Sequence, residues 1–454
     1  MKAFVCVIKN LLFALLFVSD VQAQNIPAKK ELQQERLRLA DEMENSIRNE
    51  LLNKWYPQSV DSLYGGFLST FTYNFQPTGP QDKMIVTQAR HVWSNALASR
   101  LYPRVDHYKK CAAQGFVFLK NKMWDKQHGG FYTLIDRKGN LKDSGAKTSY
   151  GNAFGIYASA AWYKASGDSA ALQLAKDCFQ WLEKAHDPVY KGYYQDLLID
   201  GTPVKRTASM PSTSSLGYKD QNSSIHLLEA FTELYSISPD KLLQQRLSEM
   251  LYLVRDVITT SRGSLALFLQ PDWTPVSFAD SSELVVLKHR NLDHISFGHD
   301  VETAYLMLEA SHVLGLKNDT TTMKVAQRMV NHALQNGWDN TSGGFYDEGY
   351  YFKNKNEITI IKNSKNWWSQ AECLNTLLLM ADHFPNDSMQ YFEKFRRQWQ
   401  YIKTYIIDHQ YGDWYEEGLD TRPEKRTALK GHIWKGTYHH LRSLSNCVQR
   451  LRKR

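Results

Sequence analysis

The chain has 454 residues, of which 43% are hydrophobic and 22% charged, with 25 glycines and 13 prolines. This composition is that of an ordinary globular protein and excludes a disordered, collagen-like or fibrous chain. Much of the formal net charge of +8 comes from Lys2 and Lys9 near the start and from residues 450–454 at the end. The sequence therefore has no concentrated basic stripe, and we expect no nucleic-acid partner.

Residues 1–23 have the pattern of a secretory signal peptide. Lysines flank an apolar run over residues 11–18, and residues 21–23 form a small-residue cleavage site before Gln24. No later stretch approaches the ~18 consecutive apolar residues of a membrane span. We expect an exported chain that begins at Gln24, does not insert into a membrane and, in a bacterium, resides in the periplasm.

Glycine–aromatic phrases recur along the chain. They stand at residues 64–67, 128–132, 191–194, 342–346 and 411–415, with a degenerate member at 262–264. Three of them follow the preceding phrase after roughly 60 to 70 residues, so six similar units are predicted. We expect each glycine to supply a turn and each aromatic residue a strand-like wall of the kind that suits sugar ligands.

Helical periodicity predicts two helices in each unit. In chain order, the expected spans are 27–53 and 84–102, 106–123 and 148–166, 169–185 and 219–236, 240–260 and 296–313, 319–336 and 365–383, and 388–406 and 430–447. Connections after the first helix of a unit are much longer than the usual loop, so we expect them at the functional end.

Twelve antiparallel helices in six hairpins can close into a ring of inner and outer helices. We therefore predict an all-α fold, an (α/α)6 barrel over residues 24–449, followed by a basic tail at 450–454. Short β-strands are expected in the long loops at the active-site end.

Polar and aromatic residues that are unexpected on apolar helices fall near the first turns of the second helix of each unit. They are Arg90, Asn152, Asn222, His226, His299, Glu302, Trp368, Gln370, Glu372, Trp434 and His439. Equivalent turns of the inner helices meet at one rim, so we expect these side chains to line a single pocket. Glu229 and Glu302 each follow a histidine by three residues on the same helix face, where a carboxylate raises imidazole basicity.

Four ordered motifs resemble the cellobiose 2-epimerase branch of the N-acylglucosamine 2-epimerase superfamily. They are DQNSSIHLLEA at 220–230, FGHDVE at 297–302, WWSQAE at 367–372 and WKGTYH at 434–439. The resemblance implies that His299 and His439 are the acid–base pair. It also implies that Arg90, Asn222, His226, Glu302, Trp368 and Trp434 line a sugar site.

The sequence departs from that family in several places. Gly436 and Thr437 stand where the epimerases usually have Cys-Pro, and His440 replaces a common Asn. Residues 198–218 have the character of an extended loop. Export is a further departure, because epimerases of this family are mostly cytoplasmic. These differences bear on the sugar that is bound more than on the chemistry.

The C2 hydrogen of an aldose becomes removable once the ring opens, because the carbanion then delocalises into an enediolate. We predict C2 epimerisation at the reducing end of a gluco- or manno-configured sugar or β-1,4-linked disaccharide. His299 and His439 would transfer protons on opposite faces, each contributing on the order of 10²–10⁴ in rate. Glu302 would orient His299, and His226 with Arg90 would handle the charge on O1 and O5. Asn152, Gln370 and Glu372 are expected to bind the sugar.

Neither a nucleotide nor a metal is needed for this chemistry, and we expect a monomer or weak dimer. Four alternatives remain open. A single base that returns the proton to C1 would give an aldose–ketose isomerase. A secreted glycoside hydrolase would use Asp300, Glu302 or Glu372. A noncatalytic sugar-binding toroid, or a zinc site built from His226, His299 and His439, would use the same rim.

Overall fold

The computed structural model describes residues 30–142 and 144–453. The predicted signal peptide at 1–23 and the cleavage site at Gln24 lie outside these residues. No helix within the described ranges has the length and apolar character needed to cross a bilayer.

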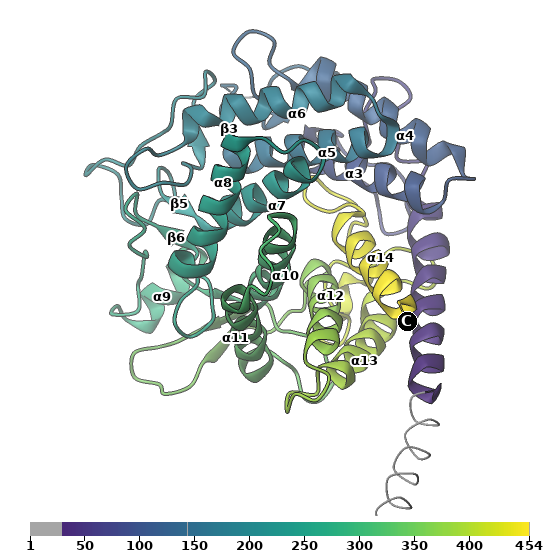
Figure 1. The fold of residues 1–454 in the computed structure, drawn as a ribbon, viewed down its shortest axis with the longest axis vertical. Coiled ribbons are helices and arrows are strands. Elements are labelled where there is room, and N and C mark those ends of the chain that lie inside the picture. Colours follow the sequence, from purple (N-terminus) through teal and green to yellow (C-terminus); the bar gives the residue numbers. More distant parts are fainter. Residues whose placement is uncertain (1–29, 143, 454) are drawn as a thin grey trace, which may run out of the picture.

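Within these ranges, six inner helices form a closed ring (Figure 1). They are α3 (Ile85–Leu101), α5 (Ser149–Ser166), α7 (Gln221–Ile237), α10 (Phe297–Val313), α12 (Trp367–His383) and α14 (Tyr438–Arg452). Each helix packs on the next in this order, and α14 packs against α3. Most residues of these helices are buried, which is typical of helices enclosed by a second layer.

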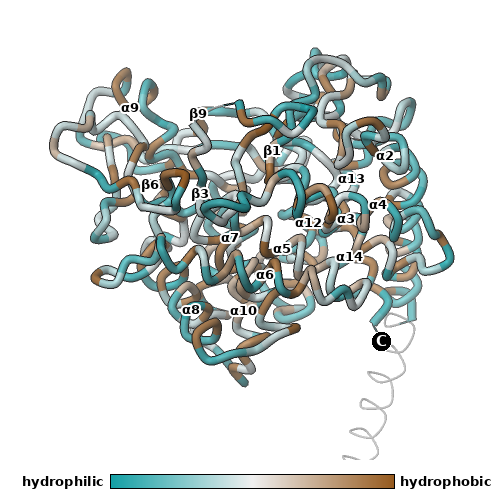
Figure 2. Tube along the Cα trace, turned by 90° about the horizontal axis from the view of Figure 1, so that it is seen from above, coloured by the Kyte–Doolittle hydropathy of each residue, from teal (hydrophilic) through white to brown (hydrophobic). Residues whose placement is uncertain are grey.

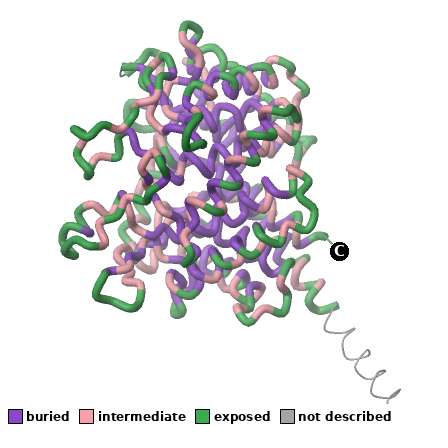
Figure 3. Tube along the Cα trace, turned by 60° about the vertical axis from the view of Figure 1, so that its left-hand side comes forward, coloured by how far each residue is buried: buried purple, intermediate pink, exposed green. Residues whose placement is uncertain are grey.

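An outer layer covers this ring and confirms the predicted (α/α)6 barrel. It consists of the helical residues 30–45 with η1 (Ser46–Leu52) and α2 (Asn53–Trp55), followed by α4 (Asp106–Phe118), α6 (Ser169–Leu182), α8 (Lys241–Tyr252), α11 (Thr320–Asn336) and α13 (Tyr391–Tyr401). Four of these helices continue into short segments, η2 (Leu119–Met123), η3 (Glu183–Ala185), η4 (Leu253–Ile258) and η6 (Ile402–Ile406). From α4 onward, each outer helix packs mainly against the inner helix that precedes it in the chain, as α4 does on α3, and η1 contacts α14. Figure 3 shows the buried residues gathered between and inside these layers.

The last inner helix differs from its predicted span at both ends. It begins at Tyr438 instead of 430, because Lys430 and Lys435 are tied into buried ion pairs that hold this segment in a non-helical course. It continues through Arg452, where a tail from 450 was predicted, because Leu451 is buried and Arg452 lies 2.8 Å from Asp41. The sequence also did not predict the short helices α9 (Glu283–His289), η5 (Arg290–Leu292) and η7 (Pro423–Thr427).

Short antiparallel strands lie at one end of the barrel (Figure 2), as the long loops predicted. They are β1 (Lys83–Met84), β2 (Leu134–Ile135), β3 (Lys147–Thr148), β4 (Asp196–Leu197), β5 (Lys219–Asp220), β6 (Phe268–Leu269), β7 (Ile295–Ser296), β8 (Glu348–Tyr350) and β9 (Thr359–Lys362). The strand before an inner helix pairs with a strand of the next long loop, as β1 pairs with β2. These pairs link neighbouring units at the end where the inner helices begin.

Each of the six units in the described chain closes its glycine turn with one isolated β-bridge, the degenerate fourth unit included. The aromatic residues of these turns are not sugar walls, contrary to the prediction: Phe67, Phe131 and Phe345 are fully buried. The ring of Phe131 packs against Gly155, where an added Cβ would lie 2.3 Å from the ring. These aromatic side chains therefore pack between the inner and the outer helices.

A buried aspartate–lysine pair crosses the glycine turn in five of the six units of the described chain. The pairs are Asp61–Lys83, Asp125–Lys147, Asp187–Lys219, Asp339–Lys365 and Asp408–Lys430, with N–O distances of 2.7–2.9 Å. The aspartate also accepts hydrogen bonds from backbone N–H groups of the turn, as Asp125 does from Gln127 and His128. Thr260 and Ile295 occupy these positions in the fourth unit.

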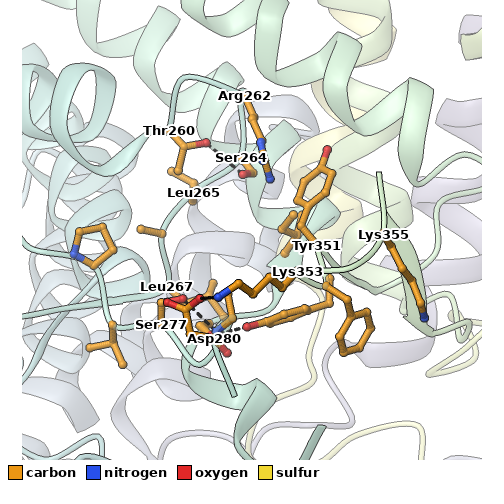
Figure 4. A pocket seen from close by; sticks show the side chains of 18 of the residues that line it. Thr260, Arg262, Ser264, Leu265, Leu267, Ser277, Asp280, Tyr351, Lys353 and Lys355 are labelled. Carbon is orange, nitrogen blue, oxygen red and sulfur yellow. Dashed lines mark hydrogen bonds and ion pairs between the residues drawn. The ribbon is translucent and has the colours of Figure 1, made fainter. Parts of the chain in front are cut away.

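A cavity of about 420 Å³ lies in this fourth unit. Thr260, Arg262, Ile295 and Tyr351 contribute to its walls, and Figure 4 shows Arg262 beside Tyr351. Ile295 and Ser296 are neighbours on β7 and point to opposite faces of the strand. Ser296 contacts a histidine of the inner ring, whereas Ile295 lines this cavity on the other side. None of the predicted site residues lines the cavity.

Candidate active site

Inner helices bring several predicted site residues together around Arg442. Its Nη2 atom lies 2.5 Å from Oε1 of Glu302 and 2.7 Å from Oε1 of Glu372, while Nη1 donates to Glu229. These carboxylates come from α7, α10 and α12, and Arg442 comes from α14. All four side chains are buried. The centre of the ring is thus a compact charge cluster enclosed by four helices.

His439 lies on the first turn of α14 beside this cluster. Its Nδ1 atom lies 2.8 Å from Oε1 of Glu372 and 3.8 Å from Oε1 of Glu302. Burial, together with the positive charges of Arg90 and Arg442, holds the pKa of His439 well below its ordinary value. The imidazole is therefore neutral at pH 7, with Nδ1 engaged and Nε2 left as the ring nitrogen for proton transfer.

His226 and Glu229 form the predicted pair, with 2.8 Å between Nδ1 and Oε2. Although burial alone would raise the pKa of Glu229, the charge of Arg442 and the hydrogen bond from His226 lower it to about 2. Glu229 is therefore ionised and fixes the orientation of the His226 ring. That ring packs against Tyr150 and Phe154, with centroids 5.2 and 4.9 Å away.

His299 is oriented by Ser296 instead of by Glu302. The Ser296 hydroxyl lies 2.8 Å from Nδ1 of His299, whereas the Glu302 carboxylate is bound by Arg442. The predicted pairing is wrong because a buried carboxylate gains more from a guanidinium than from a neutral imidazole. Burial lowers the pKa of His299 to about 3, so this ring is also neutral at pH 7.

Trp368 contacts both imidazoles named as the acid–base pair. Its ring centroid is 4.7 Å from that of His299 and 5.8 Å from that of His439. The indole is partly buried, whereas its neighbour Trp367 is in the core. A planar aromatic surface flanked by two imidazoles is suited to hold a sugar between them.

Arg90 lies on α3, the neighbour of α14 in the ring, and its guanidinium is 5.1 Å from the centre of the Tyr438 ring. Its Nη2 donates to the Tyr150 hydroxyl at 3.2 Å and its Nη1 to the carbonyl of Trp434 at 3.3 Å. Asn222 lies near Tyr150 and opposes the rise that burial causes in the pKa of that phenol. Trp434 itself is 49% exposed, in contrast to Arg90 at 5%. The arginine thus lies inside the funnel and the tryptophan at its mouth.

Asn152 and Gln370 do not join this cluster, which corrects their predicted role in sugar binding. The side-chain oxygen of Asn152 accepts the backbone N–H of Phe131 at 2.7 Å, and that of Gln370 accepts the N–H of Phe345 at 2.9 Å. Gln88 makes the same contact to Phe67. These amides belong to the repeated turn, because a buried N–H group needs an acceptor.

Two departures from the epimerase pattern also serve packing. The hydroxyl groups of Thr437 and Tyr56 share a hydrogen bond of 2.8 Å. Nε2 of His440 lies 2.7 Å from Oδ1 of Asp413. The His440 ring stacks on Trp414. Both side chains are fully buried and contact the outer layer.

Burial raises the pKa of both Glu302 and Glu372 to about 7, and repulsion between them adds to the effect on Glu302. Arg442 opposes these shifts but is shared among three carboxylates. Arg442 was not among the residues predicted from the sequence, although the sequence contains a signal for it. Three glutamates on inner-helix faces require a buried cation, and Arg442 lies one helical turn after His439 on such a face.

The cluster also bears on the metal and hydrolase alternatives. Ligand atoms of Glu302, Glu372 and His439 lie within 4.8 Å of one another, but Arg442 already supplies the cation that binds both carboxylates. Among the described residues, the three histidines of the zinc alternative form no such group. In glycoside hydrolases, the paired carboxyl groups are roughly 5 to 9.5 Å apart and flank the substrate. Glu302 and Glu372 instead both bind the same nitrogen of Arg442. Asp300 lies outside this cluster, and its carboxylate accepts a hydrogen bond of 2.9 Å from the N–H of Leu265.

Imidazoles, a tryptophan and buried arginines thus line the inside of this (α/α)6 barrel. A family model described as N-acylglucosamine 2-epimerase matches residues 65–443. The chain belongs to this family and is a carbohydrate epimerase.

Individual relatives agree with this assignment. A cellobiose 2-epimerase from Ruminococcus albus is 28% identical over 421 residues, covering 90% of this chain and 99% of that protein. The cellobiose 2-epimerase structure from Bacillus thermoamylovorans superposes with a TM-score of 0.77 at 24% identity, covering 90% of this chain and 99% of that one. A D-mannose isomerase from Thermobifida fusca is 23% identical, covering 67% of this chain and 70% of that protein.

Proposed function

We propose that the protein interconverts C2 epimers at the reducing end of a gluco- or manno-configured sugar or β-1,4-linked disaccharide. The observation that carries this proposal is the contact of Trp368 with both His299 and His439. A sugar stacked on the indole would present its C2 atom between two neutral imidazoles. Ring opening and proton transfer through an enediolate then require one base on each face of C2.

The surrounding residues have separate tasks in this proposal. Arg90, on the helix next to α14, stabilises negative charge on O1 as the enediolate forms. His226, oriented by the ionised Glu229, assists ring opening at O5. Glu372 holds Nδ1 of His439 so that Nε2 of that ring faces the substrate. No step calls for a nucleotide or a metal.

Aldose–ketose isomerisation is the second candidate, and the D-mannose isomerase relative favours keeping it. It would use the same residues, with one base returning the proton to C1 instead of C2. NMR of cellobiose, mannobiose, N-acetylglucosamine and mannose incubated with the enzyme in deuterated water separates the two. We expect a C2 epimer carrying deuterium at C2. A ketose product would favour the isomerase, and new reducing ends would favour a hydrolase.

The proposed compartment is the bacterial periplasm, and it rests on the signal-like residues 1–23. Sequons occur at Asn222, Asn318, Asn340 and Asn386. Asn222 lies near Tyr150, a partner of Arg90 inside the funnel, where a glycan would obstruct the sugar. We expect fractionation and intact-mass analysis to find an unglycosylated chain that begins at Gln24 together with periplasmic markers. A full-length cytoplasmic form would refute the compartment.

A further inference from the structure

The charge cluster around Arg442 contains more carboxyl groups than one guanidinium can neutralise. Arg442 brings one positive charge to Glu229, Glu302 and Glu372, and all four residues are at most 5% exposed. Glu229 is ionised and matches the arginine. Ionising both remaining carboxyl groups would leave three carboxylates against Arg442 and the nearby Arg90, an excess of negative charge in a buried site, which is unfavourable. Glu302 and Glu372 therefore share at least one proton near neutral pH.

Of these two acids, Glu372 makes the hydrogen bond to His439. Its Oε1 atom lies 2.8 Å from Nδ1, compared with 3.8 Å for Glu302. An ionised Glu372 accepts the Nδ1 proton and leaves Nε2 with a lone pair, which is the base form of the ring. A protonated Glu372 donates to Nδ1 and requires the proton on Nε2, which is the acid form. The protonation state of Glu372 thus selects the tautomer of His439.

Other charged and titratable groups surround the charge cluster, and the arginines and histidines among them that act on His439 disfavour an imidazolium. The surrounding groups are Arg90 on α3, Tyr150 and Tyr157 on α5, His226 on α7, His299 and Tyr305 on α10, and Tyr438, His440 and Arg442 on α14. The two arginines repel positive charge on His439 most strongly after burial itself. A proton that stayed on His439 as imidazolium would be held at a high energetic cost.

We propose that Glu372 is a positioning residue that also stores the proton His439 removes from the sugar. The C2–H bond breaks and an Nε2–H bond forms, while the electron pair delocalises into the enediolate. At the same time the Nδ1–H bond breaks and an O–H bond forms on Glu372. His439 ends neutral with its proton on Nε2, and reversal of both movements returns a proton to the intermediate. This inference rests on the proposed function, because it assumes proton transfer at C2.

The Glu372→Gln variant tests this storage of the proton. Glutamine keeps the size of the side chain and a hydrogen bond to His439, but it cannot take up the proton. We expect kcat for C2 exchange to fall roughly 10²-fold or more, with KM within about threefold. The acid limb of the wild-type kcat–pH profile should disappear. Glu302→Gln is the matched control, since this carboxyl also binds Arg442 but does not hydrogen-bond His439. Its acid limb should persist and move to lower pH, because Glu372 loses a repelling neighbour.

NMR of the wild-type protein labelled with ¹⁵N-histidine tests the same inference without a variant. Across the acid limb, the His439 signals should change from the Nδ1–H to the Nε2–H tautomer without passing through an imidazolium. An imidazolium signal there, or a Glu372→Gln enzyme with wild-type kcat and pH profile, would overturn the proposal. A wild-type enzyme that places no deuterium at C2 of any tested aldose would instead refute the proposed function, and the tautomer measurement would still decide the relay.

Discussion

Replacing Asp125 by Thr should destabilise the barrel, because it leaves Lys147 buried without a counterion. The Nζ atom of Lys147 lies 2.8 Å from Asp125 and 2.7 Å from the Ile199 carbonyl, and it also contacts the carbonyl of Gly129. Both members of the ion pair are at most 1% exposed. Removing one partner of such a pair costs about 3–5 kcal/mol. At about 2 °C per kcal/mol for a large domain, Tm should fall by about 6–10 °C.

The fourth unit supplies the matched control, because Thr260 and Ile295 stand there in place of the pair. The double variant Asp125→Thr, Lys147→Ile should therefore recover most of the stability lost by Asp125→Thr alone. Differential scanning calorimetry at pH 7 measures both variants. A single variant that melts within 1 °C of wild type, or a double variant as unstable as the single one, would refute the claim that the buried charge causes the loss.

Replacing His299 or His439 by Asn should reduce epimerisation at least about 10²-fold while the circular-dichroism spectrum and Tm stay close to wild type; retention of a tenth of the activity by both variants would exclude the paired bases. The Glu302→Gln variant should alter the pH dependence of stability. Because the folded pKa of Glu302 is about 7, above its unfolded value near 4.5, this carboxyl stabilises the fold most below pH 4.5 and loses that contribution as pH rises through 7. In urea titrations, the unfolding free energy of wild type minus that of Glu302→Gln should therefore become less positive or more negative from pH 5 to pH 8. A rise in this difference would contradict the assigned shift. Activity should survive exhaustive chelation and dialysis, since Arg442 supplies the cation of the cluster; loss with EDTA and recovery with Zn²⁺ would favour a metal enzyme instead.

The architecture could be predicted because it rests on periodic features of the sequence. The recurring glycine phrases and the alternation of short and long connections were enough to predict six hairpins and their closure. Helix ends were less predictable where long-range ion pairs decide them. The segment before Tyr438 has helical periodicity, yet the buried pair of Lys435 and Asp413 keeps it out of the helix.

The sequence placed several of the predicted residues at the centre of the ring, but it was less informative about their partners. Inner-helix spacing gave the pairing of His226 with Glu229 correctly, because both residues lie on one helix. It failed for Glu302, whose partner Arg442 is far away in sequence. Asn152 and Gln370 share the helical position of the site residues, but the side-chain oxygen of each accepts a hydrogen bond from a buried backbone N–H. Contacts between helices are not encoded in the periodicity of any one of them.

The central claim is that His299 and His439 act on opposite faces of C2. Loss of C2 deuterium from gluco- and manno-configured substrates, each labelled with deuterium at C2, tests it directly in the His299→Asn and His439→Asn variants. Neither variant should form the epimer. One should still exchange deuterium from the gluco substrate alone and the other from the manno substrate alone, because each retains the base on one face. A variant that exchanges both substrates, or two variants that exchange the same substrate, would contradict the two-base account.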